Sequence, residues 1–539
     1  MAQKGCRLVI VLLRLYKQRT ACAISPFTIC LISILLSTGL QAEDDRISRL
    51  RNDINYMCSQ ELAGRDVPGT GGDLTADWLQ ASFREIGFTP TAAGATFYQE
   101  FQLLMSSVDT SKTKLTIILP DRMVTLSWGT HFYIFPRKIG NYEAELELAY
   151  AHYGIVSAEL DRDDFAQNAR GKAALVMNGS GNIQPQRAGR HGMTPFKAAA
   201  ARRAGAELMV VMYTEDDELW IPPYVDRKIQ ESTGLLTDLP DSQPGFITVH
   251  LNGTAQMPGD SAGSSLAEDV FKVLVANSEN EFVKLHLKLI FHKSTIHIGR
   301  NVVGKISGKT DEFILFGAHY DHLGVKQENE DGNLVYYPGA DDNASGISVL
   351  LEISRLWKSR SQADKGLLIV AFGAEEDGML GSKFFADNLP VPQGKIIGMI
   401  NLDMIGRNGY ASMRALRQGS VEPDPDYAAL FYSAASPQLS SIMQGSGISA
   451  NLHLDFKPIN NFRFSDAGFF NSIGIPTISI FGGFHSDYNQ INDRPEFINW
   501  EKLAKMVLLT DKLLLNFSSA TEKIEFDNTI KAKSAVMRY

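Results

Sequence analysis

Two adjacent carboxylates, Asp341 and Asp342, lie in a turn-forming stretch, residues 338–346, just before an apolar helical pattern that begins near Ile347. The Pro, Gly and Asn residues of this stretch favour a turn at the entrance of a helix. Two carboxylates side by side repel each other unless a positive charge lies between them. A bound cation is the simplest source of that charge, so we expect the rest of the chain to supply further metal ligands.

Four more polar clusters each follow a short apolar run typical of a buried strand. They are His319-Tyr320-Asp321-His322 after residues 313–318, Gly373-Ala374-Glu375-Glu376 after 367–372, Asp403 after 396–402, and residues 484–490, which include His485, after 476–481. Each cluster alone also fits a structural role, such as a His–Asp pair or acids at the start of a helix. Together they offer imidazole and carboxylate ligands without cysteine, which suits zinc, with manganese or cobalt as lesser candidates.

The four apolar runs alternate with helical patterns over residues 347–357, 379–388 and 500–515. This alternation predicts an α/β fold in which helices cover both faces of a sheet. Such sheets carry their ligand-binding residues at the carboxyl ends of the strands, where the polar clusters fall. In an extended chain His319 and Asp321 face the same way, so one can bind metal while the other orients it.

This combination of residues points to hydrolysis. One carboxylate can bridge two metal ions, and a further glutamate that does not bind metal can take a proton from a metal-bound water. These are the parts of two-metal hydrolysis.

Two other regions carry no visible chemistry. The glycine-rich connector over residues 62–72 lacks the Lys-Ser/Thr of a phosphate-binding loop, so we interpret it as a turn. Residues 135–255 differ in texture from the rest and contain a strand–helix–strand pattern over 172–213. We interpret this region as a separate module without a catalytic role.

The composition is that of a globular chain long enough for two or three domains, with 539 residues, 44% hydrophobic and 21% charged. Beyond residue 42 the chain has 47 basic and 61 acidic residues. This acidic balance argues against nucleic-acid binding.

The first 42 residues have the architecture of a secretory signal. Basic residues up to Arg19 precede an apolar run over 27–36, and Ala42 precedes three acids. The run is shorter than the roughly 20 residues that a spanning helix needs. We expect an exported chain, periplasmic or secreted, with this segment either cleaved or kept as a membrane anchor. Three of the four cysteines lie in it, so a processed chain keeps only Cys58 and forms no internal disulfide.

Several motifs occur in one characteristic order along nearly the whole chain after residue 42. They lie at residues 62–65, 301–304, 317–324, 338–346, 374–378, 401–404, 465–476 and 485–493. Together they resemble the dizinc aminopeptidases of the bacterial leucyl aminopeptidase and aminopeptidase Y type, whose superfamily includes glutamate carboxypeptidase, glutaminyl cyclase and the transferrin receptor. The resemblance implies a mixed, mostly parallel sheet sandwiched by helices, with an inserted protease-associated domain.

The resemblance also implies a role for each matching residue and two zinc ions per chain. His319 and Asp403 would bind one zinc, Glu376 the other, and Asp342 both; Asp321 would orient His319, and Glu375 would be the general base. It further implies a cis peptide bond between Asp342 and Asn343.

One position departs from the family pattern. The family usually supplies its last zinc ligand as a histidine four residues before an acid, and here that place, before Asp493, holds Asn489. His485 is the one imidazole nearby. Three interpretations stay open: His485 ligates, the Asn489 amide oxygen ligates weakly, or that zinc is lost.

The sequence therefore predicts an exported zinc exopeptidase, an aminopeptidase, acting on peptides or proteins. The alternatives are a receptor-like binding protein, weakened or inactive as a catalyst, and glutaminyl cyclisation on the same fold. We expect a targeting segment or anchor at 1–42, a catalytic domain at 43–134 and 256–517, a protease-associated domain at 135–255 and a tail at 518–539. The side-chain specificity and the oligomeric state are not encoded in any motif that we identify.

Overall fold

The computed structural model describes residues 43–91, 96–134, 140–165, 169–183, 192, 194–214, 231–235, 246–255, 265–276, 283–328, 334–360, 363–419, 421–447, 450–460, 462, 465–520 and 523–529. The chain divides into two compact units, Met1–Asn52 and Asp53–Tyr539. In the first unit, the described residues 43–52 are helical. The predicted targeting segment lies outside the described residues, as does much of the predicted tail.

The main sheet of the second unit is mixed, with four parallel strands at its centre. Its strand order is β11 (Glu231–Leu235), β2 (Tyr98–Ser107), β14 (Thr295–Ile306), β18 (Gly366–Phe372), β15 (Phe313–His319), β19 (Ile396–Asp403), β22 (Thr477–Phe481), β20 (Tyr427–Ser433) and β21 (His453–Ile459), and β1 (Thr89–Pro90) pairs with β14. The parallel centre is β18, β15, β19 and β22. The predicted α/β sheet is confirmed.

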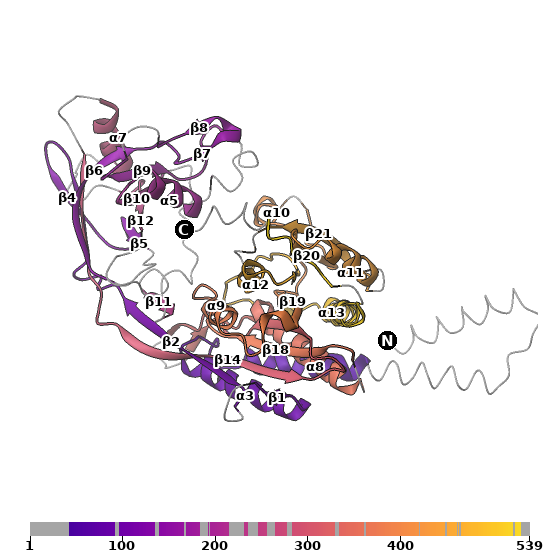
Figure 1. Cartoon of the computed structure of the whole chain (residues 1–539). Coiled ribbons are helices and arrows are strands. Elements are labelled where there is room, and N and C mark those ends of the chain that lie inside the picture. The colour runs from indigo at the N-terminus through magenta and orange to yellow at the C-terminus, as the bar shows by residue number, and fades with distance from the viewer. Residues whose placement is uncertain are drawn as a thin grey trace, which may run out of the picture. The chain divides into compact units, whose positions relative to one another are not determined.

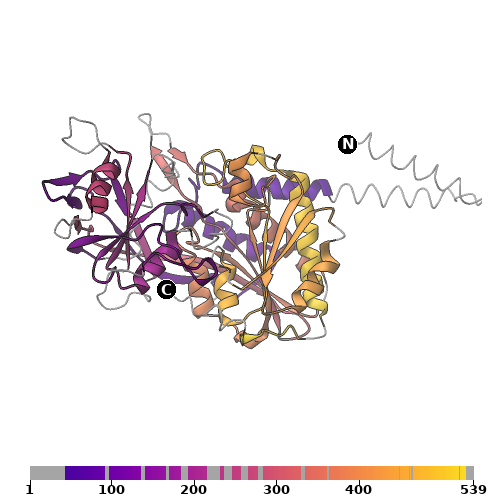
Figure 2. The same ribbon diagram turned by 90° about the horizontal axis from the view of Figure 1, so that it is seen from above.

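Helices cover both faces of this sheet (Figure 1). One face packs against α3 (Thr70–Ile86), α8 (Gly346–Ser359) and α13 (Trp500–Ser519), and the other against α9 (Leu380–Asp387) and α12 (Ala467–Ile473). Figure 2 shows the orange and yellow helices flanking strands of the same colours. The core on the α9 and α12 side includes Phe372, Phe385 and Phe470, whose rings stack in tilted and edge contacts.

The local sequence explains the elements that carry the site. Every residue of β15 and of β18 is buried, as expected for the central strands of a parallel sheet. The apolar residues of α8 face the core, and the helix follows an irregular turn over Ala340–Ser345. The peptide bond between Asp342 and Asn343 in that turn is cis, as the family resemblance implies.

A second sheet is built from residues 114–289. Its order is β4 (Met123–Leu126), β3 (Lys114–Ile118), β13 (Lys284–Leu289), β6 (Tyr142–Tyr150), β9 (Ala173–Met177), β10 (Leu208–Tyr213), β12 (Ile247–Asn252) and β5 (Phe132–Ile134). Helix α5 (Thr194–Arg203) packs against β10, and a separate apolar core fills this sheet. Its strands extend beyond the predicted module at 135–255 on both sides, because β3 and β4 pair with each other and β3 with β13. The domain boundaries stay a prediction.

Two further properties concern the described part of the chain. None of its helices combines the length and the apolar character needed to cross a bilayer. Its cysteine, Cys58, is buried and free, and burial raises the pKa of the thiol to about 12. A thiol held protonated in this way is a poor nucleophile and a poor metal ligand.

Candidate metal centre

The polar clusters of the sequence meet at one edge of the main sheet. His319 is the last residue of β15 and Asp403 the last of β19, and these strands are parallel neighbours. His319 is in register with Phe372, the end of β18, so the Glu375-Glu376 pair follows at the same edge. The turn with Asp342 leads into α8, which packs against both β15 and β19.

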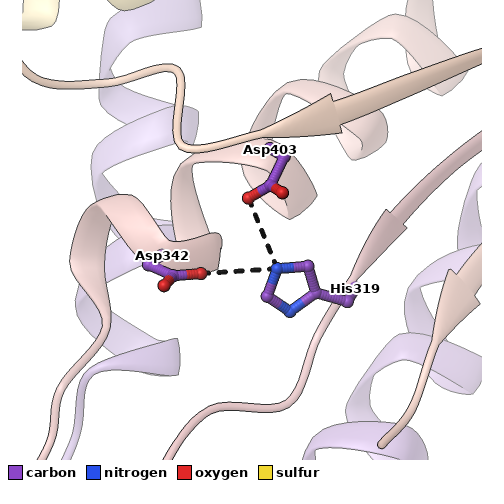
Figure 3. A group of neighbouring side chains, drawn as sticks. All are labelled: His319, Asp342 and Asp403. Carbon is purple, nitrogen blue, oxygen red and sulfur yellow. Dashed lines mark ion pairs between the residues drawn. The ribbon is translucent and has the colours of Figure 1, made fainter. Parts of the chain in front are cut away.

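The first group of potential metal ligands is His319, Asp342 and Asp403, whose ligand atoms lie within 4.8 Å of one another. The His319 Nε2 atom is 3.3 Å from Asp342 Oδ1 and 3.5 Å from Asp403 Oδ1. Both carboxylates thus point at the same ring nitrogen, one from a strand end and one from the turn (Figure 3). These are three of the residues that the sequence predicts as ligands.

A second group shares Asp342 and contains His322 and Glu376. The His322 Nδ1 atom is 2.7 Å from Glu376 Oε1 and 4.0 Å from Asp342 Oδ2. Glu376, which the sequence predicts as a ligand, therefore lies in this second group. His322 was not predicted, although it stands in the His319-Tyr320-Asp321-His322 cluster.

Asp321 links the two groups through its backbone and its side chain. Its carbonyl oxygen is 3.2 Å from His319 Nδ1, and its Oδ1 is 3.9 Å from the same nitrogen. The carboxylate accepts the backbone N–H groups of Glu375 and Glu376, at 3.1 and 3.2 Å. Asp321 can thus position the His319 ring with its carbonyl and both glutamates with its carboxylate.

The predicted ligand His485 lies beside the twin acids. Its Nε2 atom is 3.4 Å from Asp341 Oδ2, and Asp341 Oδ1 accepts the Gly406 N–H at 2.5 Å. Burial opposes protonation of His485, but Asp341 raises the pKa of the imidazole above its usual value. Among the described residues, neither of the three-ligand groups contains His485.

The alternative ligand, Asn489, is buried and has a positive φ of 58°. Within the described part of the chain its Oδ1 atom has no hydrogen-bond partner. Asp493, four residues on, is fully buried, and its Oδ2 accepts the backbone N–H groups of Asp341 and Asp342 at 2.9 and 3.1 Å. Asp493 therefore fixes the backbone of the turn that presents Asp342.

Burial raises the pKa of several aspartates in and around the two groups. The pKa of Asp403 is raised, and those of Asp321, Asp466 and Asp493 rise to about 7, with desolvation as the largest cause in each case. Desolvation disfavours the charged form of a carboxyl, and neighbouring carboxylates add to the effect. A bound divalent cation stabilises such an excess of negative charge. The charge distribution and the donor set of imidazoles and carboxylates both fit zinc.

Glu375 lies beside these groups without belonging to either. Desolvation raises its pKa well above the ordinary value, and Glu376, Asp466 and Asp403 raise it further. The side chain is still partly accessible. A carboxyl with a raised pKa that can reach bound molecules is suited to accepting and returning a proton.

Arg65 is a positioning residue for which the sequence predicted no role. It lies in the connector that we interpreted as a plain turn. Its fully buried guanidinium donates to the carbonyl oxygens of Tyr320 (2.8 Å), Met57 (2.7 Å), Pro338 (2.6 Å) and Gly339 (3.0 Å). It thereby ties the end of β15 to the turn before α8. Folding brings these four carbonyls together, and the forked guanidinium of an arginine can donate to all of them.

Comparison with known proteins identifies a family segment that contains these residues. Residues 301–513 match the model of "Peptidase family M28", a range that includes both ligand groups and Glu375. Residues 301–513 belong to peptidase family M28. The aminopeptidase YwaD of Bacillus subtilis (strain 168) is 26% identical over 247 residues, which are 45% of this chain and 41% of YwaD.

Two other similarities extend beyond the M28 segment. An aminopeptidase of Pseudomonas aeruginosa (strain UCBPP-PA14) is 24% identical over 396 residues, 71% of this chain and 62% of that protein. The alignments thus cover less than two thirds of each of these curated relatives. The structure of the aminopeptidase from Aneurinibacillus sp. strain AM-1 superposes with a TM-score of 0.56 and 20% identity, over 87% of this chain and 93% of that one. The chain therefore shares the fold of this aminopeptidase over most of its length.

Proposed function

We propose that this M28 protein is an exported zinc-dependent exopeptidase, an aminopeptidase that hydrolyses the N-terminal peptide bond of peptides or proteins. The observation that carries the proposal is the sharing of Asp342 by two three-ligand groups, with Glu375 beside both. Its relatives named as aminopeptidases support the choice among exopeptidases.

In this proposal His319, Asp342 and Asp403 hold one zinc ion, and Asp342 and Glu376 help to hold a second. When bound, zinc polarises the substrate carbonyl and lowers the pKa of an attacking water. Asp342 offers a different oxygen to each group, Oδ1 toward His319 and Oδ2 toward His322, which suits a bridging carboxylate.

Glu375 is the general base and then the general acid. It accepts a proton from the water as the water oxygen bonds to the carbonyl carbon, and it donates that proton to the amine as the C–N bond breaks. One proton enters and leaves the carboxyl, so the group is unchanged after each cycle. Asp321 keeps Glu375 in place through the hydrogen bond from the Glu375 backbone N–H.

The remaining parts of the proposal rest on the sequence. The basic and apolar segment before residue 42 would export the chain and be either removed or kept as an anchor. Residues 135–255 would be a protease-associated domain, which the separate sheet that they help to build supports.

A second candidate is a binding protein on the same fold, favoured by Asn489 at the family's usual histidine position. It predicts less than one zinc per chain and no hydrolysis. A panel of aminoacyl anilides, their N-acetylated counterparts and an N-terminal glutaminyl peptide, assayed with a zinc determination, separates the functions. Hydrolysis of free-amine substrates alone supports the aminopeptidase. Cyclisation of the glutaminyl peptide, or no turnover at all, would overturn it.

A further inference from the structure

We propose that His322 is the imidazole ligand of the second metal ion, in place of the family's usual histidine. The inference deepens the proposed function and rests on it. It replaces the two earlier candidates for this ligand, His485 and Asn489, with a residue from the other end of the catalytic segment. The presence of Asn489 would then mean that the histidine ligand comes from a different position of the chain and that the site still binds both ions.

The atoms around Asp342 carry the inference. Its Oδ1 faces His319 and its Oδ2 faces His322, so each oxygen has its own imidazole. His322 Nδ1 is also 2.7 Å from Glu376 Oε1, so an imidazole, the bridging carboxylate and the second-site carboxylate converge. Zinc–nitrogen and zinc–oxygen bonds of about 2 Å place neighbouring ligand atoms roughly 3.3 Å apart. The two distances from His322, 2.7 and 4.0 Å, lie on either side of that value.

The surroundings hold the His322 ring in this direction. The side chain is fully buried, and its backbone N–H donates to the Arg65 carbonyl at 3.3 Å. Gly339, with a φ of +57°, lies so close that a Cβ atom on it would be 2.5 Å from His322 Cδ2. A glycine is therefore required beside the ring, in the same turn that presents Asp342.

The earlier candidates are placed differently. His485 Nε2 faces Asp341, which is also bound to the Gly406 N–H, so this histidine supports the turn. Asn489 offers an amide oxygen, a weaker zinc ligand than an imidazole nitrogen. A plain buried ion pair between His322 and Glu376 is the competing explanation, and it predicts no effect of His322 on the number of bound ions.

The test is the zinc content of the full-length protein and of five variants, equilibrated with buffered free zinc and measured by mass spectrometry. His322→Ala should reduce the content from two ions to one. His485→Ala and Asn489→Ala should keep two, as should the matched control His297→Ala, which removes an exposed histidine. Because His322→Ala leaves a buried gap, His322→Gln is measured beside it. Circular dichroism of the metal-free proteins checks the fold, and the absorption spectrum of the cobalt-loaded proteins reports the loss of one nitrogen ligand.

The outcomes separate this inference from the proposed function. Two ions in the folded His322 variants would overturn it, as would a loss of one ion in His485→Ala or Asn489→Ala alone. Fewer than two ions in the unmutated protein would also overturn it. Two ions with no hydrolysis of any anilide would refute the aminopeptidase and leave the ligand assignment standing.

Discussion

His322 Nδ1 lies 2.7 Å from Glu376 Oε1, between segments that follow two neighbouring parallel strands, β15 and β18. This contact brings an imidazole to the second ligand group, whereas Asn489 stands where the family usually has its last histidine ligand. The two histidines of the His319-Tyr320-Asp321-His322 cluster then serve different ligand groups, joined by Asp342. A short segment at one strand end can in this way supply the imidazoles of both.

Replacing Glu375 with Gln should abolish turnover while the zinc content persists. The amide keeps the shape of the side chain but cannot accept the proton of the attacking water, so the rate should fall by at least about 100-fold. Neither ligand group contains Glu375, so both ions should stay bound. Anilide hydrolysis and zinc content measured on the same sample check this prediction.

Glu501→Gln, which changes an exposed glutamate in the first turn of α13, is the matched control and should leave both readouts unchanged. Full activity of Glu375→Gln would remove this residue from the mechanism. A loss of zinc along with activity would instead make Glu375 a ligand.

Replacing Arg65 with Met should weaken both the fold and the metal site. The change leaves four buried carbonyls without their donor, and such groups cost about 1–3 kcal/mol each when unpaired. We expect the free energy of unfolding of the metal-free protein to fall by about 3 kcal/mol or more, measured by urea denaturation. Zinc affinity should fall as well, because Arg65 joins the Tyr320 carbonyl to the turn before Asp342.

Arg65→Lys should recover little of this loss, since one ammonium cannot reach carbonyls that a forked guanidinium spans. Arg202→Met, at an exposed arginine of α5, serves as the control. If Arg65→Met unfolds at the same urea concentration as the unmutated protein, the positioning role assigned to Arg65 is wrong.

Lys502 should make stability depend on alkaline pH. This fully buried lysine of α13 donates to the carbonyls of Arg407 (2.5 Å) and Gly482 (2.7 Å), in the loops after β19 and β22. Desolvation lowers the pKa of Lys502 to about 8 from an ordinary value of 10.5. Between these two pH values the unfolded chain holds a proton that the folded chain has lost, so this group makes stability rise with pH.

The comparison with Lys502→Met isolates the effect. The other titrating groups contribute almost equally to both proteins, so they largely cancel in the difference between the two free energies of unfolding. This difference should stay constant below about pH 7. It should then shift in favour of the unmutated protein by at most about 3 kcal/mol up to pH 10.5. Urea denaturation at pH 7 and at pH 9.5 measures it. If the stability difference between the two proteins does not depend on pH, then Lys502 stays protonated in both the folded and the unfolded state over this range, and the lowered pKa is wrong.

The sequence predicts the parallel centre of the main sheet well, because fully buried strands read as continuous apolar runs. The runs at 313–318, 367–372, 396–402 and 476–481 correspond to β15, β18, β19 and β22 within one residue at each end. Strand β21 escaped prediction because it alternates exposed and half-buried residues at the sheet edge. Residues 264–295, for which the sequence predicted no definite helix or strand, contain helix α7 (Leu266–Ala276) as well as β13.

The site was predictable where a ligand ends a strand or enters a helix. His319 and Asp403 end strands, and Asp342 lies in the turn that leads into α8. Glu376 lies in the turn between β18 and α9, and each of the four is in a ligand group. Arg65 could not be predicted from its surroundings in the sequence, since its partner Tyr320 is 255 residues away. His322 stands in a cluster that the sequence analysis identified, but the direction of its imidazole ring depends on Gly339 and Glu376, which come close to it only in the folded protein.

The most direct test of the account is the rate of hydrolysis of a free-amine anilide as zinc is added back, in measured equivalents, to the metal-free protein. We expect no hydrolysis without metal, a rise with added zinc to a plateau at two equivalents, and no turnover of the N-acetylated anilide at any point. Full activity without zinc, or a protein that binds two equivalents and hydrolyses neither anilide, would contradict it.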